Sequence, residues 1–273
     1  MNLRAAGPGW LFCPADRPER FAKAADAADV VILDLEDGVA EADKPAARKA
    51  LQETPLDPER TVVRINPADT EQQARDLDAL AETAYTAVML SKAESAAQVA
   101  ALAPREVIAL VETPRGTVFA TEIAAAEGTV AMMWGAEDLI ATLGGSSSRQ
   151  ADGTYRDVAR HVRSATLLAA SAFGRIALDA VHLDIRDIEG LRAEADDAVA
   201  VGFDGTVCIH PSQIPVVRAA YRPSEEKLDW ARRVLAAART ERGVFAFEGQ
   251  MVDSPVLKHA EKMLRRAGEP APG

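Results

Sequence analysis

Several apolar runs of the sequence end in charged or polar side chains. The first is VVILDLEDGV, residues 30–39, where a strand-like run meets Asp34, Glu36 and Asp37. The same change follows six later runs, at Arg64 and Asn66, Ser91 and Lys92, Glu112, Glu137 and Asp138, His182 and Asp184, and His210. Carboxylates outnumber cations in this set, and a buried charge is costly unless it is paired or metal-bound. This excess of carboxylates predicts that a hard divalent cation binds at the ends of the strands.

Glu112 and Asp138 are the best candidates for ligands of that cation. Mg²⁺ takes a couple of carboxylate oxygens and leaves its other octahedral positions to water and substrate. The two residues follow neighbouring predicted strands. Two structural alternatives stay open: a salt bridge from Glu112 to Arg115, and a place for Asp138 in the first turn of a helix, where the dipole favours it.

Arg64 interrupts an otherwise apolar strand and should face a carboxylate. That carboxylate belongs either to the protein, at Asp34 or Glu36, or to a substrate held by two hydrogen bonds. We favour the substrate. Asp34, Glu36 and Asp37 either cap the following loop or support a metal site from outside its ligand set.

The order of elements predicts how these side chains are brought together. Eight apolar runs alternate with alanine-rich helical segments, which is typical of βα units around a parallel sheet. In a (β/α)8 barrel the working face lies at the carboxyl ends of the strands. The expected strands are residues 9–14, 30–35, 61–66, 87–91, 106–112, 129–134, 180–185 and 206–210. A helix over 70–83 should turn Ala74, Leu77 and Leu80 towards the sheet.

The fold class predicted is therefore α/β, a (β/α)8 TIM barrel with a C-terminal helical extension. The barrel should span residues 1–221, and the extension residues 222–273. His182 and His210 are interpreted as hydrogen-bonded barrel residues rather than catalysts.

Composition narrows the class of partner. The chain has 273 residues, with 31 Lys+Arg against 42 Asp+Glu and a formal charge of -11, which disfavours nucleic acid and favours small molecules. Cys13 and Cys208 show neither disulfide nor metal spacing, so we expect a cytoplasmic protein. We expect no membrane partner, because no apolar stretch approaches the roughly 20 residues of a bilayer span.

Nine motifs in order, from Trp10 to Leu264, resemble the citrate lyase β-subunit family, within the magnesium-dependent aldolase and malyl-CoA lyase group. They include VILDLEDGVAEADKPAAR, VRIN, LVETPRG, GAEDLIATLG and MVDSPVLKHAEKML. The resemblance implies a Mg²⁺-binding (β/α)8 barrel that cleaves or forms a carbon–carbon bond in a 3-hydroxyacyl thioester. It also implies a homo-oligomer, with a trimer favoured.

The resemblance also implies roles for particular residues. Glu112 and Asp138 hold the metal, and Arg64 holds the carboxylate of the oxo acid. Asp253 is the acid–base group that the C-terminal extension, acting as a lid, brings to a neighbouring subunit's site. Glu36 and Asp37 hold metal-bound waters and orient Arg64.

The phosphates of coenzyme A need cations, and three side chains near the first two strands are candidates for them. These are Arg17, Lys23 and Lys44. Asp253 has a structural alternative, because with Ser254 and Pro255 it makes a good helix start.

Three other functions compete with the lyase. Lys92 at a strand end could form a Schiff base with a keto acid, as in metal-independent aldolases. The enolate could instead pass to water or another acceptor, which would make the chain a thioesterase or synthase. The chain could also be a complex-dependent subunit that acts on a carrier-bound thioester.

Overall fold

Eight parallel strands close into a barrel, as the sequence predicts. The computed structural model describes residues 3–241 and 243–269, so residue 242 and the last four residues of the predicted extension lie outside the described residues. The barrel strands are β1 (Gly9–Pro14), β2 (Val30–Asp34), β3 (Thr61–Ile65), β4 (Ala87–Leu90), β5 (Glu106–Val111), β6 (Thr129–Trp134), β7 (Ile176–Asp179) and β8 (Gly205–Cys208). Each strand pairs with the next in sequence, and β8 pairs with β1.

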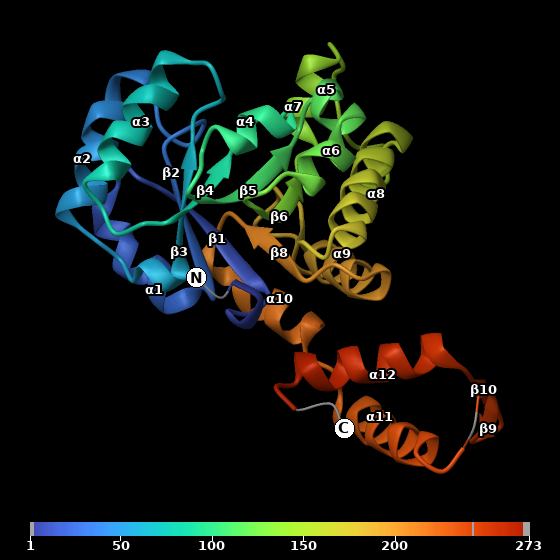
Figure 1. Ribbon diagram of the computed structural model, residues 1–273. Helices are drawn as coiled ribbons and strands as arrows, with labels where there is room; N and C mark the ends of the chain where they lie inside the picture. The colour runs from blue at the N-terminus through green and yellow to red at the C-terminus, as the bar shows by residue number, and fades with distance from the viewer. Residues whose placement is uncertain (1–2, 242, 270–273) are drawn as a thin grey trace. The chain divides into compact units, whose positions relative to one another are not determined.

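Helices surround the closed sheet (Figure 1). Those of the barrel are α1 (Phe21–Ala27), α2 (Lys44–Glu53), α3 (Glu71–Ala81), α4 (Ala96–Ala100), α5 (Pro114–Val118), α6 (Ala120–Ala125), α7 (Glu137–Thr142), α8 (Asp157–Ala172), α9 (Ile188–Val201) and α10 (Ile214–Tyr221). Short 3-10 helices are η1 (Leu3–Ala5), η2 (Pro18–Arg20), η3 (Glu41–Asp43), η4 (Pro58–Arg60) and η5 (Pro211–Gln213).

Alternation along the strands decides which side chains enter the barrel. Its interior core includes Val30 and Ile32 of β2, Val62 of β3, and Ile108 and Leu110 of β5. Successive side chains of a strand point to opposite faces. The next inward positions at the carboxyl end are therefore Asp34, Arg64 and Glu112, which share one layer at the mouth of the barrel.

Strand seven was predicted wrongly. The sequence favoured residues 180–185, whereas β7 is Ile176–Asp179 and pairs through Ala131↔Ile176 and Leu178↔Gly205. Residues 176–179 are a short apolar run and residues 180–185 alternate apolar and polar side chains, and either pattern is compatible with a strand. The register imposed by β6 and β8 selects the earlier one.

The prediction of which side chains of the 70–83 helix face the sheet was also wrong in part. Leu80 is buried, but Ala74 is exposed and Asp76 is fully buried. Asp76 accepts a hydrogen bond from Arg48 Nε at 2.7 Å. An ion pair between α2 and α3 therefore occupies part of a surface that the sequence assigned to alanine.

The chain forms two compact units, which meet between Arg218 and Ala219. This division lies within α10 and close to the predicted boundary at 221. The second unit holds α11 (Glu225–Ala238), the antiparallel hairpin of β9 (Phe245–Phe247) and β10 (Gln250–Val252), and α12 (Ser254–Arg266). It has a small core of its own, to which Leu228, Val234 and Leu264 belong. The action of this unit as a lid stays a prediction.

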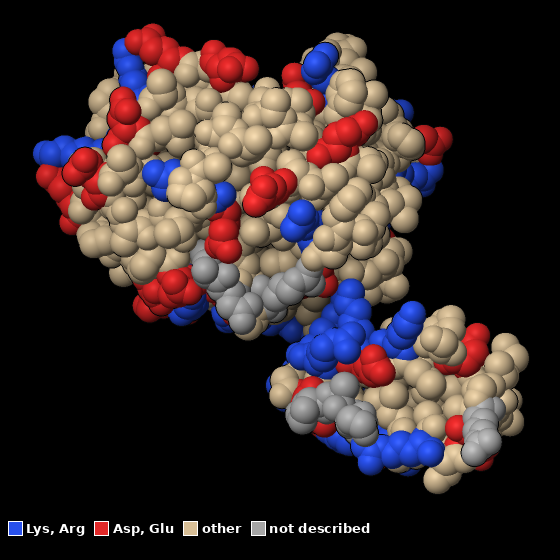
Figure 2. Space-filling view, viewed as in Figure 1, with Lys and Arg blue, Asp and Glu red and all other residues tan. Residues whose placement is uncertain are grey.

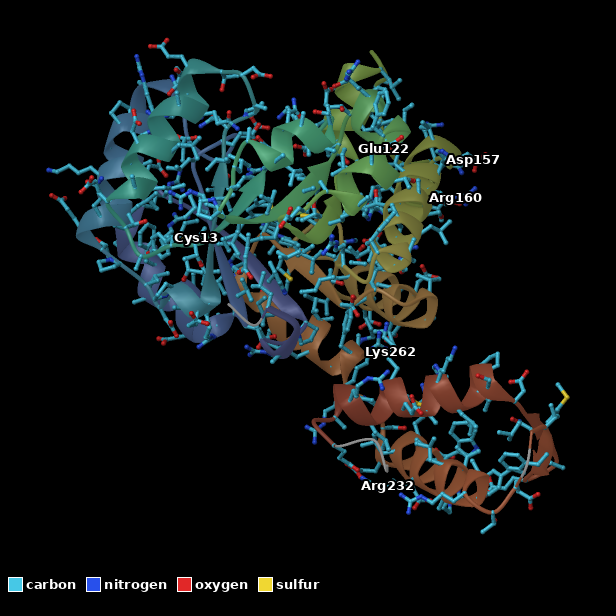
Figure 3. All side chains as sticks on the ribbon, viewed as in Figure 1. Cys13, Glu122, Asp157, Arg160, Arg232 and Lys262 are labelled. Carbon is cyan, nitrogen blue, oxygen red and sulfur yellow. The ribbon has the colours of Figure 1, made fainter. Side chains whose placement is uncertain are left out.

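Cys13 and Cys208 are both free and buried, and Figure 3 labels the first of them. Burial raises the pKa of Cys13 to about 11 and that of Cys208 to about 12, which disfavours the reactive thiolate form of both. Acidic and basic side chains are interspersed over the face drawn in Figure 2.

Within residues 3–241 and 243–269, no helix has the length and apolarity needed to cross a membrane.

Candidate active site

A cavity of about 370 Å³ opens at the carboxyl ends of the barrel strands. Its charged lining includes Asp34, Asp37, Arg64, Glu112 and Asp138. The apolar remainder comes mostly from β1 and the last three strands of the barrel and the loops after them. Every lining residue belongs to the barrel unit. The layer expected from strand alternation therefore borders this cavity.

Glu112 follows β5 and is only 3% exposed. Its Oε1 accepts a hydrogen bond from the peptide N–H of Lys92 at 2.9 Å. Gly135 permits the close approach of β6, because a Cβ there would lie 2.8 Å from Glu112 Oε2. Burial, and then the charge of Asp138, raises the pKa of Glu112 to about 8. The alternative bridge to Arg115 is wrong, since Arg115 pairs with Glu94 at 3.9 Å.

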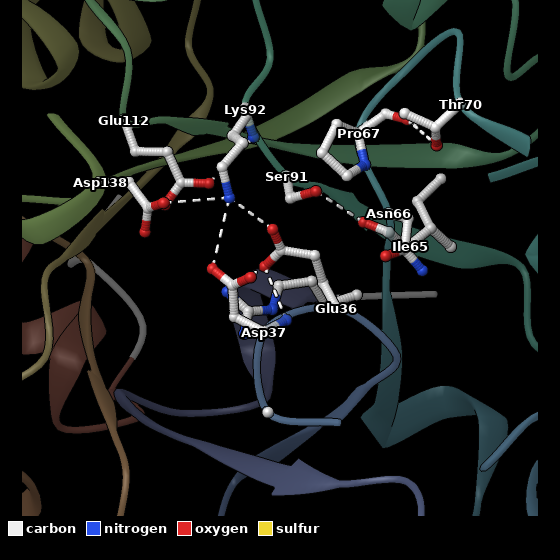
Figure 4. A network of polar contacts seen from close by, with 12 residues as sticks. Glu36, Asp37, Ile65, Asn66, Pro67, Thr70, Ser91, Lys92, Glu112 and Asp138 are labelled. Atoms are coloured by element: carbon white, nitrogen blue, oxygen red, sulfur yellow. Dashed lines mark hydrogen bonds and ion pairs between the residues drawn. The ribbon is translucent and has the colours of Figure 1, made fainter. Parts of the chain in front are cut away.

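Asp138 occupies the first turn of α7, as the helix-dipole alternative supposed. Its Oδ1 also lies 3.1 Å from Lys92 Nζ, and Figure 4 shows its carboxylate beside that of Glu112. The carboxylates of Glu112 and Asp138 repel each other at a partly open rim of the cavity. Such a pair suits Mg²⁺, which needs few protein ligands. Among the described residues, no cluster of three or more His, Cys, Asp or Glu side chains has metal-holding geometry. A site with two protein ligands fits that finding.

Glu36 lies at the centre of the acidic group, 3% exposed. One oxygen lies 2.5 Å from Lys92 Nζ and the other 3.2 Å from Arg64 Nη1. Burial raises the pKa of Glu36 against the opposing charge of Arg64. Asp37 is more exposed and lies 3.3 Å from Lys92 Nζ. Glu36 therefore contacts the guanidinium of Arg64, while the roles of Glu36 and Asp37 in orienting Arg64 and holding metal-bound waters stay predictions.

Lys92 does not suit the Schiff-base alternative. Burial disfavours its charged form, but the hydrogen bond to Glu36 and the charges of Glu112 and Glu36 outweigh burial and raise the pKa of Lys92. A Schiff-base lysine needs a lowered pKa so that its amine is free to attack. The electrostatics at this position act in the opposite direction.

Arg64 pairs with a protein carboxylate. Its Nε and Nη2 donate to the two oxygens of Asp34 at 2.7 and 2.6 Å, and its guanidinium lies 4.5 Å from the ring centre of Phe12. Asp34 also accepts hydrogen bonds from the peptide N–H groups of Glu36 and Gly38, both at 2.9 Å. A Cβ at Gly38 would collide with Asp34 Oδ2. The glycine after the carboxylates thus lets the loop fold onto Asp34.

Lys44 was predicted wrongly as a ligand of coenzyme A phosphate. It is buried, and its ammonium donates to Leu35 O at 2.7 Å, Glu36 O at 3.1 Å and Asn66 Oδ1 at 2.8 Å. These three bonds use every donor of an ammonium. Arg17 and Lys23 are exposed, and their role in binding phosphate stays a prediction.

Asp253 is the N-cap of α12 and accepts a hydrogen bond from the peptide N–H of Val256 at 3.3 Å. The capping role that the sequence left open is therefore present. Asp253 also borders an open cavity of about 630 Å³ within the second unit. Its acid–base role stays a prediction.

Sequence reasoning missed Asp179, which is the residue at the true end of β7. It accepts hydrogen bonds from Trp134 Nε1 at 2.6 Å and from Arg163 Nη2 at 2.8 Å, so it holds an aromatic wall of the cavity. The signal was available, since IALD ends in a carboxylate just as VILD does. His182 pairs with Glu194 at 2.9 Å and His210 caps η5, so both are hydrogen-bonded barrel residues, and their lack of a catalytic role stays a prediction.

Comparison with known proteins agrees with the geometry. The family model described as HpcH/HpaI aldolase/citrate lyase matches residues 9–211. A citrate lyase subunit beta-like protein of Mycobacterium tuberculosis is 84% identical over 98% of both chains. A (3S)-malyl-CoA thioesterase of Cereibacter sphaeroides is 36% identical, over 94% of this chain and 93% of that one.

Human mitochondrial citramalyl-CoA lyase is 32% identical, over 88% of this chain and 78% of that one. The crystal structure of CitE from Mycobacterium tuberculosis in complex with magnesium, acetoacetate and coenzyme A superimposes with a TM-score of 0.94. It is 84% identical and covers 98% of this chain and 100% of that one. The chain therefore belongs to the HpcH/HpaI aldolase/citrate lyase family, as its motifs indicate.

Proposed function

We propose that this protein is a Mg²⁺-dependent carbon–carbon lyase. Its substrate is a 3-hydroxyacyl-CoA thioester, which it cleaves to an acyl-CoA such as acetyl-CoA and a small oxo acid, or forms in the reverse direction. The observation that carries the proposal is the convergence of Glu112 and Asp138 on one rim of the cavity, with Arg64 in the same layer. The magnesium, acetoacetate and coenzyme A of the solved relative support it.

Glu112 and Asp138 would hold the metal. When bound, Mg²⁺ supplies Lewis acidity that favours ionisation of the substrate hydroxyl. The two carboxylates need no rearrangement of the strands to serve, since both already face the cavity.

Arg64 would bind the carboxylate of the oxo acid. Asp34 fixes the guanidinium through two of its N–H groups, and Glu36 takes a third. A guanidinium carries more N–H groups than these bonds use. A fixed orientation aligns the scissile bond, which lies between the hydroxyl-bearing carbon and the carbon next to the thioester.

Cleavage releases the hydroxyl proton to solvent and leaves an enolate of the acyl-CoA, whose carbon then takes a proton from a carboxyl group that solvent protonates again. We assign this transfer to Asp253, brought to the site by a neighbouring copy's C-terminal unit. A carboxyl group is suited to the step. Arg17 and Lys23 would bind the phosphates of coenzyme A. A homotrimer and a cytoplasmic location belong to the same proposal, supported by the family resemblance and the two free thiols.

A thioesterase is the second candidate, because a (3S)-malyl-CoA thioesterase is 36% identical. The two activities differ in product. A lyase yields an acyl-CoA and an oxo acid, whereas a thioesterase yields free coenzyme A and the intact hydroxy acid.

The test is incubation of the purified protein with malyl-CoA and citramalyl-CoA, with Mg²⁺ or with EDTA, followed by separation of the products. The reverse reaction pairs acetyl-CoA or propionyl-CoA with glyoxylate, pyruvate or oxaloacetate. We expect Mg²⁺-dependent acyl-CoA and oxo acid. Turnover of a carrier-bound thioester alone would instead identify a complex-dependent citrate lyase-type subunit.

A further inference from the structure

Lys92 contacts both carboxylates to which the proposed function assigns the metal. Its peptide N–H donates to Glu112 Oε1 at 2.9 Å, and its ammonium lies 3.1 Å from Asp138 Oδ1. The same ammonium contacts Glu36 at 2.5 Å and Asp37 at 3.3 Å (Figure 4). A single residue of the β4–α4 loop thus connects the ends of β2, β5 and β6.

The backbone of Lys92 is held in the left-handed region, with φ at 49°. This conformation is unfavourable for a residue with a Cβ, and it persists only where surrounding contacts maintain it. The bonds to Glu112 and to the acidic group are such contacts. The strain therefore lies at the residue that joins the two proposed ligands.

The charges explain what the ammonium does in the absence of metal. Glu36 is fully engaged by Lys92, Arg64 and the peptide N–H of Asp37. Asp138 has one cationic partner among the described residues, and it is Lys92. If this ammonium were removed, Asp138 would face the buried carboxylate of Glu112 with no cation beside it.

We propose that Lys92 is the counter-ion of the metal-free site and sets the affinity of that site for a divalent cation. This inference rests on the proposed function. The ammonium holds Asp138 until a cation replaces it there, and it then stays with Glu36 and Asp37. Its positive charge opposes the entering cation, so metal binding is weaker than the carboxylates alone would make it. Lys92 is a positioning residue, since it acts through Glu112 and Asp138.

The test is the affinity of the full-length protein for Mg²⁺, measured by isothermal titration calorimetry without substrate. Lys92→Gly removes the ammonium, keeps the peptide N–H and suits the positive φ. Lys92→Met also removes the charge but keeps the backbone strain. We expect both variants to bind Mg²⁺ about tenfold tighter, the order for removal of one charge close to a partly screened divalent ion. Lys92→Arg keeps the charge and should bind as the wild type does.

A merely structural role for Lys92 predicts the opposite sign, because a disordered site binds Mg²⁺ more weakly. The matched control is Lys49→Met, which removes an exposed ammonium 3.2 Å from Glu53 on α2 and should leave Mg²⁺ affinity unchanged. Unchanged or weaker binding by both the Gly and Met variants would overturn the role of Lys92 alone. Absence of Mg²⁺ binding by the wild type would overturn the proposed function as well.

Discussion

Replacing Glu112 by glutamine should stabilise the metal-free protein at alkaline pH, although it removes a proposed ligand. The pKa of Glu112 rises from 4.5 to about 8 through burial and the charge of Asp138. Between these values the folded state keeps a proton that the unfolded chain has released. Stability therefore falls as pH rises through this range, because the folded state binds more protons than the unfolded state.

The size of the effect follows from the pKa values. Each unit of pKa corresponds to about 1.36 kcal/mol, so ionising Glu112 in the folded state costs up to about 5 kcal/mol above pH 8. The side chain is 3% exposed, so solvent screens little of this cost. Glutamine keeps the acceptor for the Lys92 N–H but carries no charge. The two proteins should be about equally stable near pH 5 and differ most near pH 9.

The assay is urea unfolding in EDTA across this pH range, with Glu53→Gln as the control. Glu53 is exposed and pairs with Lys49 at 3.2 Å, so its variant should follow the wild type at every pH. Addition of Mg²⁺ should stabilise the wild type and leave Glu112→Gln unaffected. Lower stability of Glu112→Gln at pH 9, or an advantage that is independent of pH, would contradict a protonated Glu112 in the folded protein.

Further outcomes follow from the same contacts. Asp34→Ala should cost about 3–5 kcal/mol in urea unfolding, because it leaves Arg64 without its main partner; Asp57→Ala, at an exposed cap, is the comparison. Asp253→Asn should keep the α12 cap and the melting temperature but lower kcat on the order of 10²-fold; a loss below tenfold would restrict Asp253 to capping. Lys44→Met should destabilise by about 1–3 kcal/mol without raising the KM for the CoA ester; a raised KM at unchanged stability would restore a phosphate role. EDTA should abolish turnover and Mg²⁺ restore it; activity retained in EDTA would contradict the metal assignment.

Most of the barrel could be predicted from the sequence because its strands are strongly apolar and end sharply. Seven of the eight expected runs overlap the observed strands within a residue or two. The exception, β7, is only four residues long and is followed by a second run that is also compatible with a strand. Its position depends on pairing with β6 and β8, which no local window contains.

The residues of the candidate site likewise divide into those that could be predicted from the sequence and those that could not. Glu112 and Asp138 could be found because each stands where an apolar run stops, and that position alone brings it to the barrel mouth. The different partners of the Lys44 and Lys92 ammonium groups could not be predicted from the sequence. Both follow a strand, yet one ammonium is buried on two carbonyl oxygens and an amide while the other enters the acidic group.

The sequence by itself determined the fold class, the family, and the place of Arg64, Glu112 and Asp138 at the carboxyl ends of strands, because the end of an apolar run is a local property of the chain. Only the tertiary structure decided the partners: Arg64 with Asp34, Lys92 with Glu36 and Asp138, and Asp179 with Trp134. These contacts join residues far apart in sequence, and barrel closure sets which of them meet. The pairing of charges depends on the distance between side chains in the folded barrel and on their burial. Neither is encoded in spacing along the chain.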